Sequence, residues 1–193
     1  DAFRFFWVKV DDDGALPALV DALRPLRLRG QLNSAVHIGN DLRIISSLRP
    51  YPREEAEGAA PLPAAVRARI RAEVGAGAWN VSGALAGTRA QVRESARALR
   101  RAAAGLGKVV FVDDRKLALG RTVAALLGKV GLGATLRSQL DGLAPNYGLL
   151  KGVPTDQPLA GTYWRLHAPE EPGADPLDAG CGLMWMSPVL PLR

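Results

Sequence analysis

The chain has 193 residues, of which 48% are hydrophobic, so it can bury the core of one ordinary domain and is not expected to be disordered. Its 25 lysines and arginines exceed its 19 aspartates and glutamates, a net charge of +6, but most arginines are spread over alanine- and leucine-rich stretches typical of solvated helix faces. Only Arg97, Arg100 and Arg101 approach a basic cluster, so we expect no nucleic-acid partner.

The cysteine and histidine counts argue against a metal site. Cys181 is the single cysteine, and His37 and His167 are the only histidines and lie far apart in the sequence. No stretch approaches the roughly 18 consecutive apolar residues of a membrane helix, so we expect no membrane partner. The chain opens at Asp1 without a signal peptide, which we interpret as the start of a piece of a longer polypeptide. Its compartment, cytoplasmic or periplasmic, is therefore left open.

The opening of the chain predicts a strand followed by a helix. Aromatic and β-branched residues dominate residues 3–10, which indicates a largely buried strand. Residues 11–14, three aspartates and a glycine, form a turn whose carboxylates can cap the next helix. Apolar residues recur at helical spacing over residues 16–24, and Pro25 is expected to end or bend this helix.

The segment that follows is less regular. Apolar positions in residues 34–45 fit neither the helical nor the strand period, and we favour a short helix over a strand. We interpret His37, within this segment, as a buried hydrogen-bonded residue rather than a catalyst. Residues 49–63 contain four prolines and indicate an exposed connection with little core of its own. A helix is expected over residues 64–74.

The clearest supersecondary unit lies in the middle of the chain. Residues 79–86 predict a strand, Thr88 a helix N-cap, residues 92–104 a helix, and residues 108–112 a second strand, which together form a β-α-β unit. Another helix, capped by the two aspartates at positions 113 and 114, and a short helix near residues 136–140 follow. With the leading strand and helix, this pattern predicts an α+β fold of ferredoxin-like character.

Composition changes in the last third. Glycine, proline, tyrosine and tryptophan crowd together in residues 146–156, 161–165 and 180–189. This mixture is typical of sites where the backbone approaches a planar ligand between aromatic side chains. A loop-rich segment whose aromatic residues fill the core would have the same composition, so both interpretations stay open.

Several motifs in this region carry a family resemblance. Gly-Leu-Leu-Lys-Gly-Val-Pro at residues 148–154, Tyr-Trp-Arg at 163–165 and Met-Trp-Met-Ser-Pro-Val at 184–189 occur in this order. They resemble the cap domain of the family of FAD-linked oxidases that contains the 4-cresol dehydrogenase (p-cresol methylhydroxylase) flavoprotein and vanillyl-alcohol oxidase. Residues 79–81 and 87–92 are similar to a strand and helix of the same cap.

The resemblance implies an FAD-dependent oxidoreductase that removes hydride from the benzylic carbon of a para-substituted phenol. The cap, an antiparallel sheet covered by helices, would lie over the FAD isoalloxazine and form part of the phenol pocket. Residues 1–193 would all belong to this cap and would be a truncated form of it. The flavin-binding domain would precede Asp1, and the end of the cap and a C-terminal segment would follow Arg193. We therefore expect the isolated chain to be inactive.

The resemblance also implies site residues. Trp185 falls on the tryptophan of the family's Met-Trp run and would be a wall of the phenol pocket, with Tyr163 as a second substrate-binding residue. Tyr163, Thr162 and Cys181 are the candidates for contact with the cofactor. The tyrosine and the histidine that link flavin covalently in relatives fall on Thr162 and Leu183, so no covalent link is expected. No catalytic residue is assigned.

One further departure from the family concerns the substrate. A glutamate that the family places near the substrate falls on Pro158, so the substrate need not be a simple cresol. Dehydrogenase and oxidase chemistry both stay open.

The partners implied are an aromatic small-molecule substrate and a cytochrome or another electron acceptor. A second copy of the chain is a further expected partner, because more strands should follow Val189 and their absence leaves an open sheet edge that can pair. The alternative function is a stand-alone ferredoxin-like binding or interaction module without flavin chemistry.

Overall fold

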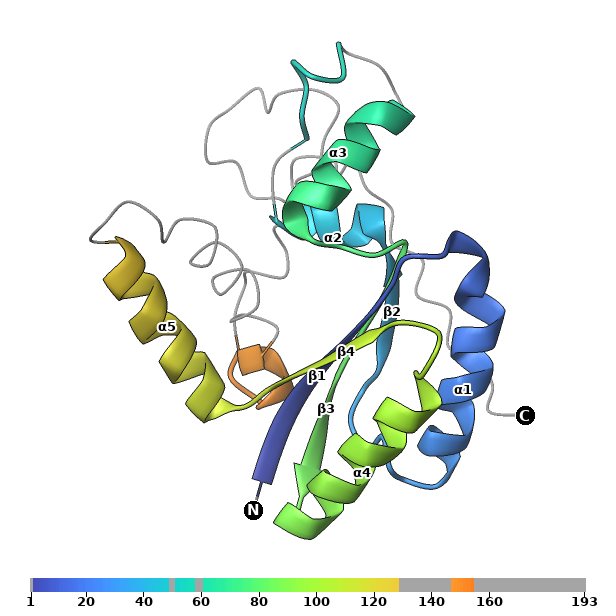
Figure 1. The fold of residues 1–193 in the computed structure, drawn as a ribbon, viewed down its shortest axis with the longest axis vertical. Coiled ribbons are helices and arrows are strands. Elements are labelled where there is room, and N and C mark those ends of the chain that lie inside the picture. The colour runs from blue at the N-terminus through green and yellow to red at the C-terminus, as the bar shows by residue number, and fades with distance from the viewer. Residues whose placement is uncertain (1, 49–50, 58–60, 129–146, 155–193) are drawn as a thin grey trace.

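The computed structural model describes residues 2–48, 51–57, 61–128 and 147–154, and in this part of the chain one antiparallel sheet has four strands (Figure 1). The strands are β1 (Ala2–Val10), β2 (His37–Asn40), β3 (Trp79–Gly87) and β4 (Lys108–Val112), in the order β2-β3-β1-β4. β1 is central: its Phe6 lies opposite Gly83 of β3 and Phe111 of β4. The strand predicted at the start of the chain is confirmed.

The connections define a ferredoxin-like topology. β1 is joined to β2 through α1 (Leu16–Leu28), and β3 is joined to β4 through α4 (Arg89–Ala102). The two strands of each β-α-β unit are parallel to each other and are separated by one strand of the other unit, since every hydrogen-bonded pair is antiparallel. The predicted α+β, ferredoxin-like class is therefore confirmed.

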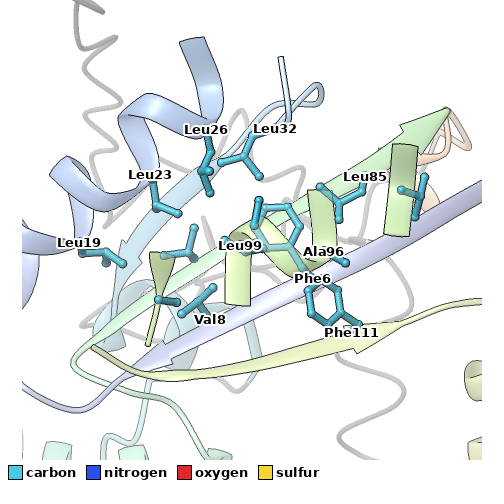
Figure 2. Close-up of a cluster of buried hydrophobic side chains, with 14 of the residues drawn as sticks. Phe6, Val8, Leu19, Leu23, Leu26, Leu32, Leu85, Ala96, Leu99 and Phe111 are labelled. Atoms are coloured by element: carbon cyan, nitrogen blue, oxygen red, sulfur yellow. The ribbon is translucent and has the colours of Figure 1, made fainter. Parts of the chain in front are cut away.

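The main core lies between one face of the sheet and the layer of α1 and α4 (Figure 1). Side chains alternate across a strand, so every second residue of β1, Phe6, Val8 and Val10, points into this core. Figure 2 shows the side chains of the sheet packing against the apolar faces of α1 and α4, which are formed by Leu19, Leu23, Leu26, Ala96 and Leu99. Each buried leucine, valine or phenylalanine of this core contributes roughly 1.5 to 3 kcal/mol when it is removed from water.

The start of α4 is fixed by local hydrogen bonds. The Thr88 hydroxyl accepts from the backbone N–H of Gln91, and the Gln91 side chain accepts from the backbone N–H of Thr88. This capping box satisfies two amides that have no partner inside the helix. The predicted N-cap is confirmed, although the helix begins at Arg89, earlier than the predicted residue 92.

The first helix does not end at Pro25. α1 continues to Leu28, and the backbone N–H of Arg29 then donates to the carbonyl of Pro25. Pro25 is exposed, whereas Leu26 is 6% exposed and extends the apolar stripe of the helix. Burial of Leu26 therefore favours one more turn of helix. Because Pro25 has no N–H, one backbone carbonyl of the helix loses its usual partner, and Pro25 lies on the exposed side, where water can hydrogen-bond instead.

The segment 34–45 is a strand and a helix in succession. β2 occupies His37–Asn40, and α2 (Asp41–Leu48) follows without a gap, so the prediction of a helix alone was wrong for residues 37–40. β2 is a short edge strand with a glycine and two polar residues, so it lacks the alternation of apolar and polar residues by which a strand is recognised. His37 is exposed, contrary to the prediction of a buried residue.

An insertion between β2 and β3 has a core of its own. It contains α2 and α3 (Ala64–Val74), and its buried residues are Ile45, Tyr51, Ala56 and Ile70. Tyr51 and Ala56 are 8% and 1% exposed, so the described part of the predicted connection is not without a core. The segment packs because its tyrosine and alanine meet the apolar faces of both helices.

Candidate functional site

The second face of the sheet lies opposite α1 and α4. Strand alternation places Phe3, Phe5, Trp7 and Lys9 of β1 on this face, and the strand pairing adds Asn80, Ser82, Ala84, Val110, Val112 and His37. Figure 1 shows α5 (Asp114–Gly128) and the orange helical turn at residues 147–150 on this side of the sheet. We call it the second face below.

One end of the second face is covered by an aromatic cluster. Phe5 and Tyr147 are buried, and the Tyr147 ring meets Phe3 edge-on with centroids 5.4 Å apart. Leu117 of α5 completes the buried part of this cluster, and Phe3, Trp7, Val112 and Leu150 pack against it. The cluster attaches the family motif at residues 148–154 to the sheet through the tyrosine that immediately precedes it.

A polar tie reinforces this attachment. Oδ1 of Asp114 accepts hydrogen bonds from the Tyr147 hydroxyl at 2.7 Å and from Nζ of Lys151 at 2.6 Å. The Lys151 ammonium also lies 5.4 Å from the Phe3 ring centroid and 5.2 Å from that of Tyr147, within the range of cation-π attraction. Asp114 thus joins the start of α5 to the segment that carries the motif.

The tie sets the protonation states of its members. The hydrogen bond from Lys151, followed by that from Tyr147, lowers the pKa of the Asp114 carboxyl. Burial, together with the neighbouring Asp114 carboxylate, raises the pKa of Tyr147. The tyrosine therefore stays protonated at neutral pH and acts as a hydrogen-bond donor rather than a base.

The middle of the second face carries a tryptophan in a fixed orientation. Nε1 of Trp7 donates to Oδ1 of Asn80 at 3.3 Å. Asn80 is 3% exposed, and its amide closes a turn by accepting from the Gly77 N–H at 3.0 Å and donating to the Gly77 carbonyl at 2.9 Å. A buried amide with all these partners cannot move freely, so it fixes the indole as well.

The four site residues inferred from the family, Thr162, Tyr163, Cys181 and Trp185, lie outside the described residues, as do Pro158, Leu183 and the helix expected near residues 136–140. The structure instead gives polar contacts to residues that the sequence did not single out as site residues: Trp7 binds Asn80, and Asp114 binds Tyr147 and Lys151. Trp7 was assigned to a buried strand and Asp114 to a helix cap. Strand alternation would have placed Trp7 on the face with Phe3 and Phe5, away from Phe6 and Val8.

Among the residues that the structure describes, no three or more histidine, cysteine, aspartate or glutamate side chains gather in a way that could hold a metal ion. None of the described helices has the length and apolar character needed to cross a membrane.

Comparison with known proteins identifies relatives over nearly the whole chain, although no family model matches it. The 1'-carboxy-chondrochloren decarboxylase of Chondromyces crocatus is 29% identical over 190 residues, 97% of this chain and 35% of that protein. The 4-cresol dehydrogenase (hydroxylating) flavoprotein subunit of Pseudomonas putida is 27% identical over 191 residues, 99% of this chain and 30% of that protein. The chain thus spans about a third of the length of these relatives.

Two solved structures share the fold. One is p-cresol methylhydroxylase with substrate bound, with a TM-score of 0.59 at 24% identity over 84% of this chain and 28% of that one. The other is the 4-ethylphenol oxidase of Gulosibacter chungangensis in complex with isoeugenol, with a TM-score of 0.64 at 23% identity over the same shares.

The fold is thus a helix-covered antiparallel α+β sheet that matches part of a p-cresol methylhydroxylase-like flavoprotein. The sequence match to a 4-cresol dehydrogenase flavoprotein subunit confirms the resemblance recognised from the motifs, and the two solved structures confirm the fold.

Proposed function

We propose that the full-length protein is an FAD-dependent oxidoreductase that oxidises a para-substituted phenol, and that residues 1–193 are part of its cap domain. The observation that carries the proposal is the alignment of 99% of this chain with a 4-cresol dehydrogenase flavoprotein subunit, of which it covers 30%. The flavin-binding domain is assigned to sequence before Asp1, and the remainder of the cap to sequence after Arg193.

The described residues fit the ring of a flavin or phenol better than they fit a nucleotide. The second face offers aromatic side chains at its surface, which suits a wall beside a planar ring. Phosphates bind readily at open helix starts, and those of η1 (Asp13–Ala15), α4 and α5 are closed by side-chain caps from Asp12, Thr88 and Asp113. We assign the pyrophosphate of FAD to the flavin-binding domain that the family resemblance implies.

When bound, FAD supplies the acceptor for the hydride that leaves the benzylic carbon. The role of this chain is to cover the ring system, exclude water and hold the phenol. Trp185 and Tyr163 are proposed as walls of the phenol pocket. Thr162, Tyr163 and Cys181 are proposed to lie against the flavin without a covalent link.

A second candidate reaction is the loss of a carboxyl group from an aromatic substrate. It is favoured by the relative named 1'-carboxy-chondrochloren decarboxylase, which matches 97% of this chain. The two proposed reactions differ in the group that the substrate carries.

Self-association belongs to the same proposal. β4 is the edge of the described sheet, and its Val110 is 54% exposed. An edge strand of this kind can pair with a strand of another copy. Sedimentation of the isolated chain should show a dimer, and a monomer at every concentration would contradict it.

Production of the full-length protein tests the function. It should purify with a flavin spectrum and oxidise 4-alkylphenols, with a cytochrome or another acceptor taking the electrons. Residues 1–193 alone should show neither flavin nor turnover. A colourless full-length protein that binds neither FAD nor phenols would instead favour a stand-alone interaction module.

A further inference from the structure

The family motif at residues 148–154 folds into a capped helical turn. The backbone N–H of Val153 donates to the carbonyl of Gly148 at 3.0 Å, a bond typical of the Schellman arrangement that ends helices. This arrangement needs a residue with positive φ, which Gly152 supplies at +82°. Pro154 then prevents the helix from continuing. The turn thus accounts for Gly152 and Pro154 of the motif without a ligand.

One carboxylate oxygen joins both ends of this turn to α5. Tyr147, just before the motif, and Lys151, within it, donate to Oδ1 of Asp114 at 2.7 and 2.6 Å. The buried Tyr147 ring also packs on Phe3 and Phe5, which fixes the turn against β1. Because Asp114 is the first residue of α5, three segments distant in sequence meet at this point.

These contacts suit the positioning of the turn better than the stabilisation of the whole fold. The side chains of Asp114 and Lys151 are 69% and 31% exposed, so water screens their ion pair. What the contacts can change is the fraction of molecules in which the turn lies in this position. That fraction in turn sets where the chain leaves the sheet at Pro154.

We propose that Asp114 is a positioning residue for the phenol pocket and acts through the hydrogen bonds that fix the turn at residues 147–154. The inference rests on the proposed function, in which Thr162 and Tyr163, shortly after Pro154 in the sequence, lie against flavin and phenol. Asp114 itself touches neither molecule. A ligand that binds only when the turn is in place has an apparent Kd that rises as the competent fraction falls.

The test measures kcat and KM for 4-ethylphenol in the full-length holoprotein. Asp114→Ala and Tyr147→Phe should each raise KM about two- to fivefold, the range expected for a screened contact, and leave kcat nearly unchanged. In the Asp114→Ala background, Tyr147→Phe should have no further effect, because both changes remove a bond to the same oxygen. Asp114→Asn, which keeps an acceptor oxygen, should restore part of the affinity.

Asp21→Ala is the matched control. Asp21 lies on α1, is likewise 69% exposed and pairs with Arg24 at 3.0 Å, so its loss should leave KM unchanged. An unchanged KM in Asp114→Ala, or an equal rise in Asp21→Ala, would overturn the inference. So would a fall in melting temperature with an unchanged KM, since that result identifies a purely structural contact.

Hydrogen exchange tests the fixed turn without a substrate. In the full-length protein, Asp114→Ala should speed the exchange of the Val153 amide, whereas Asp21→Ala should not. Unchanged exchange in Asp114→Ala would overturn the inference even if the protein oxidises phenols. Failure of the proposed function is a different result, in which the wild type binds no FAD and does not oxidise 4-ethylphenol.

Discussion

At the scale of single residues, two adjacent aspartates have separate tasks. Asp113 caps α5 by accepting from the backbone N–H of Lys116 at 3.0 Å. Asp114 is thereby left to bind Tyr147 and Lys151. Its side chain is 69% exposed, so the ion pair with Lys151 is screened by water and contributes less than about 1 kcal/mol.

We predict that Asp114→Asn lowers the melting temperature of the full-length protein slightly at pH 7. The folded state lowers the pKa of this carboxyl, so its stabilisation is present above the ordinary value of 3.8 and is lost as pH falls below it. Thermal melts should therefore show a difference from wild type at pH 7 that shrinks below about pH 3.8. A difference that stays constant with pH would show that the charge of Asp114 is not involved.

A second residue-scale prediction concerns Trp185, the proposed wall of the phenol pocket. Trp185→Ala should weaken phenol binding about ten- to a hundredfold, since it removes a planar contact of roughly 1 to 3 kcal/mol. The melting temperature and phenol affinity should be measured on the same full-length variant. Lost stability with intact affinity in the folded fraction would identify Trp185 as a core residue instead.

At the scale of elements, a buried aspartate, Asp41, connects the insertion of α2 and α3 to the start of β3. Asp41 is fully buried, and its backbone N–H donates to the carbonyl of Ala78 just before β3. Its carboxylate receives two hydrogen bonds from Arg67 of α3, at 2.8 and 2.6 Å, while Arg71 lies 4.0 Å away. This bidentate pair fixes the two helices of the insertion together.

Arg67→Ala should destabilise the protein by about 3 kcal/mol, because it leaves the Asp41 carboxylate buried without its main partner. Arg69→Ala on the same helix is the matched control. Arg69 is exposed and pairs with Glu55 and Glu73 at the surface, so its loss should cost less than about 1 kcal/mol. Equal effects in urea unfolding would rule out a special role for the buried pair.

The elements that could be predicted from sequence are those with strong local signals. Thr88 and Gln91 mark the start of α4, and the apolar run of β1 identifies a central strand before any partner is known. β2 could not be predicted, because a short edge strand depends on pairing with β3 rather than on its own residues. The core position of Tyr51 likewise depends on α2 and α3.

The candidate site was only partly predictable for the same reason. The family motifs are short, contiguous stretches of sequence, so they could be recognised without knowledge of the fold. Residues 7, 37, 82 and 110 lie side by side on the second face, but they meet only through the register of the sheet. Such an arrangement has no signature in any one stretch of sequence.

At the scale of the whole molecule, the mode of flavin attachment follows from two positions. The family resemblance implies that the flavin-tethering tyrosine and histidine positions are occupied by Thr162 and Leu183, so we expect no covalent link. The full-length protein should therefore release its flavin when it is precipitated with acid. Yellow colour that stays in the pellet would contradict this and direct attention to Tyr163 or Cys181.

We propose that the full-length protein takes hydride from the benzylic carbon of a phenol and that this chain is part of its cap. The most direct test mixes the full-length holoprotein with 4-ethylphenol without oxygen and follows the flavin absorbance. We predict that the absorbance bleaches, and that deuterium at the benzylic carbon slows the bleaching. Flavin that stays oxidised with 4-alkylphenols would contradict the claim.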